Sequence, residues 1–126
     1  MDAIDIQNAI MARIRDIADR PSLIYPDEGV EAPLPRWVLE VASSTSRGLL
    51  INKALTETDA EVMVRVETAS GDYGAESGSL VKKLLAAFPV SEKFSGVRIA
   101  TPPKVQAPYS TGASYAVPVI IRARAY

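Results

Sequence analysis

The chain has 126 residues and a formal net charge of −1, which predicts a single domain spanning residues 1–126 with no strong bias toward nucleic acid or anionic membrane. It contains no histidine and no cysteine, which removes the commonest general base, the commonest zinc ligands and the thiol nucleophile, so we expect no enzyme, metal or cofactor. The N-terminus is acidic and no apolar run approaches ~18 residues, so we expect neither a secretory signal nor a membrane span.

The first predicted element is a helix from Ala3 to Ala18. Asp2 and Asp5 lie at its start, where carboxylates suit the helix dipole, and Arg20-Pro21 closes it because a residue before proline avoids the helical region. Four isoleucines at spacings of four, four and three share one face of this helix: Ile6, Ile10, Ile14 and Ile17. The residues that follow predict a short extended segment, 23–26, and then a loop, 27–35.

Two strands are predicted next. Residues 36–42 form the first, with Trp37 as a core anchor, and residues 43–48 are small and polar, so we expect them to be mobile. Residues 56–59 are predicted to turn into a second strand that begins at Ala60, which together make a hairpin. The second strand carries β-branched residues at every second position, so it has one apolar face: Val62, Val64 and Val66.

A glycine turn over residues 70–74 predicts the start of a second helix, whose apolar stripe ends at Phe88. The members of the stripe recur at spacings of one and three: Leu80, Val81, Leu84, Leu85 and Phe88. Residues 97–99 predict a short strand and residues 104–114 a loop.

The last predicted strand runs from Tyr115 to about Arg124. Proline lacks an amide donor, so Pro118 predicts that this strand lies at an edge of the sheet, or at least has an unpaired amide side there. These elements predict an α+β fold: a mainly antiparallel sheet of about four strands, with two main helices packed on one face.

Candidates for chemistry are few. The carboxylate pairs Asp27/Glu28 and Asp59/Glu61 fall in or beside predicted turns, so solvated acids are a better interpretation than catalytic ones. The glycines of residues 71–74 lack the spacing and the lysine–hydroxyl pair of a phosphate-binding loop. Residues 91–126 contain one acid, Glu92, against five cations: Lys93, Arg98, Lys104, Arg122 and Arg124. This excess of positive charge indicates either an ordinary surface, a face complementary to another in an assembly, or a basic face near a polyanion.

Five motifs follow one another along the chain in a characteristic order. They are Ile24-Tyr25-Pro26-Asp27, Pro35-Arg36-Trp37-Val38-Leu39, a turn from Gly71 to Gly74, a helix end from Leu84 to Phe88, and a final strand Tyr-x-Val-Pro-Val-x-Ile beginning at Tyr115. Their order and spacing resemble the tail terminator proteins of long-tailed bacteriophages and gene transfer agents. Residues 43–53 depart from the hairpin of that family.

The resemblance implies a structural, non-enzymatic virion protein at the junction of tail and neck, assembled in the host cytoplasm. Such a protein forms a ring, usually a hexamer, that caps the tail tube, ends its polymerisation and provides the head–tail joining surface. The implied partners are other copies of itself, the tail tube protein, the head–tail connector or stopper protein, and DNA that passes through the lumen without sequence reading. No membrane is implied.

Under this resemblance the final strand would meet the sheet of a neighbouring subunit. Arg122 and Arg124 would line the lumen and face DNA, although outward surface arginines are the alternative. The predicted interface residues lie on that final strand: Tyr115, Val117, Val119 and Ile121. Two other functions stay open, namely a head–tail connector or stopper of the same neck, and a small non-enzymatic nucleic-acid-binding protein that uses its basic C-terminal region.

Overall fold

The structure, a computed structural model, describes residues 2–26, 28, 32–48, 56–69, 75–112 and 114–125. The predicted glycine turn at residues 70–74 and the acid Asp27 lie outside these residues. The helices are α1 (Ala3–Arg15) and α2 (Ala75–Ala86). The strands are β1 (Ser22–Ile24), β2 (Arg36–Gly48), β3 (Thr56–Ala69), β4 (Lys93–Phe94), β5 (Val97–Ile99), β6 (Lys104–Val105), β7 (Tyr109–Thr111) and β8 (Ser114–Ala125).

Helix α1 begins where the sequence predicts and ends three residues early. The Asp2 carboxylate accepts a hydrogen bond from the Asp5 amide at 2.9 Å, and the Asp5 carboxylate accepts one from the Asp2 amide, which is a capping box. At the other end Asp16 leaves the helical conformation, and the Arg20 guanidinium donates to the Arg15 carbonyl at 2.9 Å. This side-chain cap, donated from five residues along the chain, satisfies a terminal carbonyl, and the helix ends before the proline that we expected to stop it.

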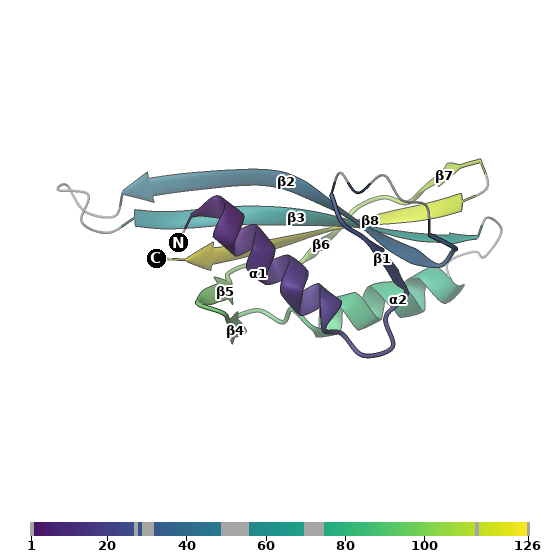
Figure 1. The fold of residues 1–126 in the computed structure, drawn as a ribbon, viewed down its shortest axis with the longest axis horizontal. Coiled ribbons are helices and arrows are strands. Elements are labelled where there is room, and N and C mark those ends of the chain that lie inside the picture. Colours follow the sequence, from purple (N-terminus) through teal and green to yellow (C-terminus); the bar gives the residue numbers. More distant parts are fainter. Residues whose placement is uncertain are drawn as a thin grey trace.

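The sheet is larger and more mixed than the sequence predicts, although the α+β class is confirmed. Eight strands are described, in the order β1-β2-β3-β8-β5-β4, with β6 and β7 also pairing with β8 (Figure 1). The pair β1–β2 is parallel and the other pairs are antiparallel. Residues 104–114, predicted as a loop, contain β6 and β7. Strands of two and three residues are too short to show a periodicity.

The predicted hairpin is confirmed, and it is longer than expected. Residues 43–48, which we expected to be mobile, and residues 56–59, which we expected to turn, extend β2 and β3. The register shifts between Val41 and Ser44 and then continues from Ser44↔Ala60 to Gly48↔Thr56. Backbone pairing needs no apolar side chain, so the ladder runs on through small polar residues and projects past α1 (Figure 1).

The prediction that β8 lies at an edge is wrong. β8 pairs with β3 along its whole length and with β5, β6 and β7 on its other side. Pro118 is accommodated because it falls between β6 and β7, where its carbonyl accepts from the Gln106 amide at 2.9 Å. A residue of an antiparallel pair points its amide and its carbonyl to the same neighbour. The missing donor of Pro118 therefore faces this break between the two short strands.

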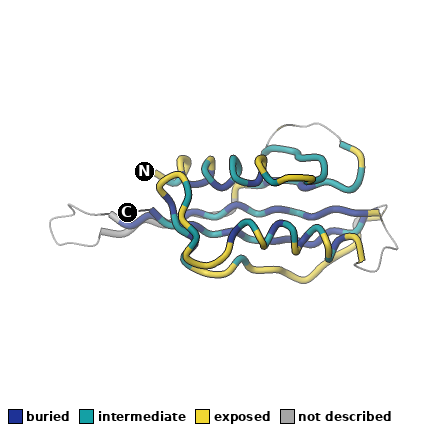
Figure 2. Tube along the Cα trace, turned by 90° about the horizontal axis from the view of Figure 1, so that it is seen from below, coloured by how far each residue is buried: buried dark blue, intermediate teal, exposed yellow. Residues whose placement is uncertain are grey.

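One face of the sheet forms the core with both helices. Both α1 and α2 contact β3 and β8, and Trp37 and Phe88 are fully buried, as their expected role as core anchors requires. Figure 2 shows the strands as the buried middle of the molecule, with helix turns that alternate between buried and exposed. The alternate positions of β3 confirm the period-two pattern by lying at 0% exposure: Val62, Val64 and Val66.

Candidate functional site

The residues predicted as a subunit interface lie in the core of the protomer. Val119 and Ile121 have 0% exposure and Val117 has 8%, while Tyr115 is half-buried and packs against the same core. The pattern Tyr-x-Val-x-Val-x-Ile marks the face of β8 that the helices cover. As a correction to the sequence prediction, the three aliphatic side chains are therefore not available to a neighbouring subunit in this fold.

Arg122 and Arg124 lie on the opposite face of β8, away from the helices, and both are held by acids of β3. The two nitrogens Nε and Nη2 of Arg124 donate to the two carboxylate oxygens of Asp59, at 2.7 and 3.3 Å. Arg122 Nη2 donates to the same carboxylate at 2.8 Å. Arg124 also pairs with Glu57 at 2.7 Å, and Arg122 lies 3.8 Å from Glu61. Both guanidiniums are thus charge-compensated on the open face of the sheet.

Asp59 is the centre of this cluster. The hydrogen bond from Arg124 is the main cause that lowers the pKa of Asp59 below its ordinary value; burial opposes this shift, and the hydrogen bond from Arg122 reinforces it. Its side chain is only 10% exposed. The carboxylate therefore stays ionised, and it fixes two arginines that stand two residues apart on β8.

These acids are not the solvated turn residues that the sequence predicts, because they lie in β3 and pair with Arg122 and Arg124. The signal that identifies them is the spacing of Glu57, Asp59 and Glu61 at every second position, which matches the spacing of Arg122 and Arg124. This spacing predicts that the three acids share one face of their strand, but it does not identify the residues with which they pair. Only the register, in which Asp59 faces Arg124 and Glu61 faces Arg122, brings the opposite charges together.

A second ion-pair cluster lies further along the same face. Arg36 Nε and Arg65 Nε donate to the two oxygens of Glu67, at 2.6 and 3.0 Å, and Arg65 also pairs with Glu40. Burial alone would raise the pKa of Glu67, but the hydrogen bonds from Arg36 and Arg65 outweigh it and lower this pKa. The uncovered face therefore carries two clusters in which each arginine pairs with at least one acid, rather than a single basic field.

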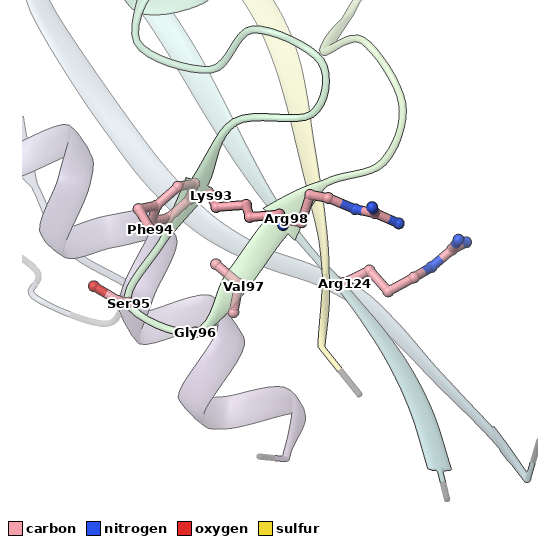
Figure 3. Close-up of a pocket in the computed structure, with 7 residues that line it drawn as sticks. All are labelled: Lys93, Phe94, Ser95, Gly96, Val97, Arg98 and Arg124. Atoms are coloured by element: carbon pink, nitrogen blue, oxygen red, sulfur yellow. The ribbon is translucent and has the colours of Figure 1, made fainter.

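Two pockets border the first cluster along β8. One has a volume of about 590 Å³ and contacts Glu61, Lys104 and Arg122 among its lining residues. The other, of about 470 Å³, lies between the β4–β5 turn and Arg124 (Figure 3). Within the described ranges no group of three or more acids, histidines or cysteines is arranged to hold a metal ion.

An unpaired backbone edge lies on β2. β1 pairs only with Arg36–Val38, and no other described strand pairs with that side of β2 from Leu39 to Gly48. Val41, on this edge, is 50% exposed although Val62, its partner in the β3 ladder, is buried. Edges of this length invite pairing with another chain.

No helix in the described part of the chain is long and apolar enough to cross a bilayer.

Comparison with known proteins identifies a fold without a function. No family model and no curated protein matches the chain. Among the solved structures that match is a protein whose name describes no activity; it shares 20% identity with a TM-score of 0.61, and the match covers 98% of this chain and 91% of that one. A likeness at this identity shows a shared fold over the whole domain and nothing of its role.

Proposed function

We propose that this protein is a structural ring subunit that terminates the tail tube of a long-tailed phage or gene transfer agent particle. In this proposal the ring ends tube polymerisation and provides the surface that joins the filled head, and no catalysis takes place. The motif order described for residues 24–121 suggests the family. The structural observation that carries the proposal is the unpaired edge of β2 on a hairpin that projects beyond the helices.

The ring contact in this proposal uses β2 and not β8. A free strand edge of ten residues would promote aggregation in a solitary protein, whereas in a closed ring it would be paired. Leu39 to Gly48 can add a strand of a neighbouring copy by backbone hydrogen bonding, and the exposed Val41 side chain would be an apolar contact in that pairing. The neighbours in the particle would be other copies of this chain, the tail tube protein and the head–tail connector or stopper.

The uncovered face of the sheet fits a wall past which DNA moves. Arg122 and Arg124, which we still propose as the residues facing the lumen, are bound to Asp59, Glu57 and Glu61. A compensated guanidinium releases few counterions from DNA, so the face would hold a passing duplex only weakly. Weak, sequence-independent contact suits transit better than retention.

Electron microscopy of particles produced without the gene tests this function. A terminator predicts tails of uncontrolled length beside filled heads that do not join them. Empty or leaking heads beside tails of normal length would instead indicate a connector or stopper of the neck. Normal particles would refute both assignments, and tight, salt-dependent binding of the free monomer to DNA would favour a nucleic-acid-binding protein.

A matched pair of variants tests the β2 edge. Val41 and Val90 are 50% and 49% exposed, so lysine at either position leaves the core intact, but only Val41 lies on the open edge. In light scattering we expect the unmodified protein to have the mass of a ring, which is a whole multiple of the monomer mass. Val41→Lys should abolish this ring, and Val90→Lys should preserve it. Equal loss in both variants, or in neither, would contradict pairing through β2.

A further inference from the structure

The sheet has a second open edge, on the side opposite β2. There β6 pairs with β8 on one side, and no described strand pairs with its other side. We call residues 104–107, which begin with β6, the strap; all four are exposed. The strands β3 and β8 separate the strap from β2, so the two open edges face in opposite directions (Figure 1).

Each open edge carries one exposed valine, and the two valines lie on the same face of the sheet. Val41 of β2 stands opposite Val62, and Val105 of the strap stands opposite Val119. Val62 and Val119 are core residues with 0% exposure, and residues opposite each other in a ladder share a face. Val41 and Val105 therefore lie on the face that the helices cover, but at its two borders, where they are 50% and 47% exposed.

The backbone of Val105 points away from β8. The Gln106 amide donates to the Pro118 carbonyl of β8 at 2.9 Å. In an antiparallel ladder a residue directs its amide and its carbonyl to the same neighbour, and the next residue directs them to the other side. The amide and carbonyl of Val105 thus face the open side of the strap.

The same alternation, followed across the sheet, places the amide and carbonyl of Val41 on the open side of β2. Because Pro118 faces β6, Val119 faces β3, where it lies opposite Val64. The next residue of β3, Arg65, then faces β2, and its partner there, three residues before Val41, faces back. The β2–β3 register stays regular up to Val41, so Val41 itself points outward.

The strand directions also fit a continuation of the sheet from one copy to the next. β2 and β8 are both antiparallel to β3, and the strap is antiparallel to β8, so the strap is antiparallel to β2. Val41 shares a row of the sheet with Ile121, whereas Val105 shares one with Val119, two residues away. Placing Val105 opposite Val41 therefore adds a stagger at each contact, which a closed sheet of tilted strands requires.

We propose that the strap of one copy pairs with the β2 edge of the next copy, with Val105 opposite Val41. This inference rests on the proposed ring and names the second half of its contact. Both backbones then find partners, and the two exposed valines cover each other on one face. Two β2 edges could also pair with each other, but that contact is isologous, closes as a dimer and leaves both straps open.

The contact is short and has defined ends. With Val105 at Val41, Ala107 reaches Leu39, and the pairing stops before residues 36–38, where β1 is bound. Prolines flank the strap at 103 and 108. Proline lacks an amide donor, so these residues limit how far another strand can pair along this edge. The strap is therefore selective for a short stretch of β2.

Thiol cross-linking tests the pairing, because the chain contains no cysteine and an introduced one reports a single position. Val41→Cys protein labelled with heavy nitrogen is mixed with unlabelled Val105→Cys protein and treated with a bismaleimide. Paired strands hold opposite Cα atoms about 5.5 Å apart, within reach of this reagent. Intact mass spectrometry then separates mixed dimers from dimers of either variant with itself.

We expect mixed dimers of Val41→Cys with Val105→Cys in roughly tenfold excess over those that Val41→Cys forms with Val90→Cys. A docked contact holds two thiols at an effective concentration near about 1 mM, far above that of micromolar free protein. Val90 is the matched control because it is 49% exposed and follows α2, away from both open edges.

Three results would overturn the proposal. Predominant dimers of Val41→Cys with itself would show isologous pairing of two β2 edges. Equal yields with Val105→Cys and Val90→Cys would reduce the product to random encounter. No cross-linked product in concentrated protein would show that the strap and β2 do not meet. Tail length in particles without the gene is independent of all three, because a terminator ring can close through another surface, and a cross-link beside normal particles would reject the function alone.

Discussion

Replacing Arg13 by methionine should loosen the contact between the two helices and the β4–β5 hairpin. Arg13 Nε donates to the Ala87 carbonyl at 2.7 Å, just past the end of α2, and Nη2 pairs with Glu92 at 3.2 Å. The guanidinium also stacks over Phe94 at 4.6 Å. Methionine keeps most of the apolar stem and removes these three interactions together.

The expected loss is about 2 kcal/mol of unfolding free energy, worked from the three contacts. A hydrogen bond from a charged donor to a carbonyl contributes about 1.5 kcal/mol at the lower end of its range. The stacking on Phe94 adds about 0.5 kcal/mol. The pair with Glu92 adds little, because the two side chains are 32% and 38% exposed and solvent screens them.

Urea unfolding followed by far-ultraviolet circular dichroism measures this loss, and a midpoint of thermal unfolding lower by about 8 °C should accompany it. A double-mutant cycle with Phe94→Leu isolates the stacking, for which we expect a coupling of about 0.5 kcal/mol. The control is Arg15→Met, on the same helix turn, whose guanidinium contacts only the exposed Asp16 carboxylate among the described partners. That control should change stability by less than about 0.5 kcal/mol.

A loss in Arg13→Met no larger than that in Arg15→Met would refute the view that Arg13 joins the helices to the hairpin. So would a coupling of zero with Phe94, because the short distance between guanidinium and ring would then carry no energy. A large loss with an unchanged hairpin in amide NMR would move the effect to α2 and the Ala87 carbonyl.

Four further predictions concern stability. Asp59→Asn should lower the unfolding free energy by about 1–2 kcal/mol in urea, because two guanidiniums lose their shared carboxylate. The pKa values of Asp59 and Glu67 are lowered in the folded state, so their contribution is present at neutral pH and is lost as the pH falls below about 4, where the unfolded chain takes up protons first; urea midpoints that stay flat down to pH 3 would contradict this. Leu84→Ala, at a site with 0% exposure, should cost about 3 kcal/mol in the same assay. Gly96→Ala should cost about 1 kcal/mol because its φ is 83°, whereas Gly78→Ala in α2 should be neutral or stabilising.

The parts of the fold with a strong period could be predicted from the sequence. Ile6, Ile10 and Ile14 of α1 and the valines of β3 and β8 repeat at intervals that only a helix face or a strand face explains, and all three sets are buried. The small polar residues 43–48 and the segment 104–114 have no such repeat. Their strands arise from backbone pairing with a neighbour that is already in place, which is information that lies elsewhere in the chain.

The site could be predicted only in its residue types. The sequence identifies Arg122 and Arg124 as the outward residues of the last strand, and the structure agrees on their face. Their partner Asp59 is more than sixty residues away, and its role depends on a register that no local pattern encodes. Pro118 led to the wrong prediction that β8 lies at an edge of the sheet. A break between two short neighbouring strands leaves the position without a required amide donor, as a sheet edge does.

The unbroken register of β3 and β8 has a consequence for how this protein can change over evolutionary time. Twelve consecutive pairs, from Thr58↔Ala125 to Ala69↔Ser114, align without a bulge. One residue inserted or deleted within either strand would exchange its two faces, sending Asp59 or Arg124 into the core and the valines into solvent. Sequence length is therefore free to drift at strand ends and at the existing bulge of β2, while these two strands must evolve by substitution alone.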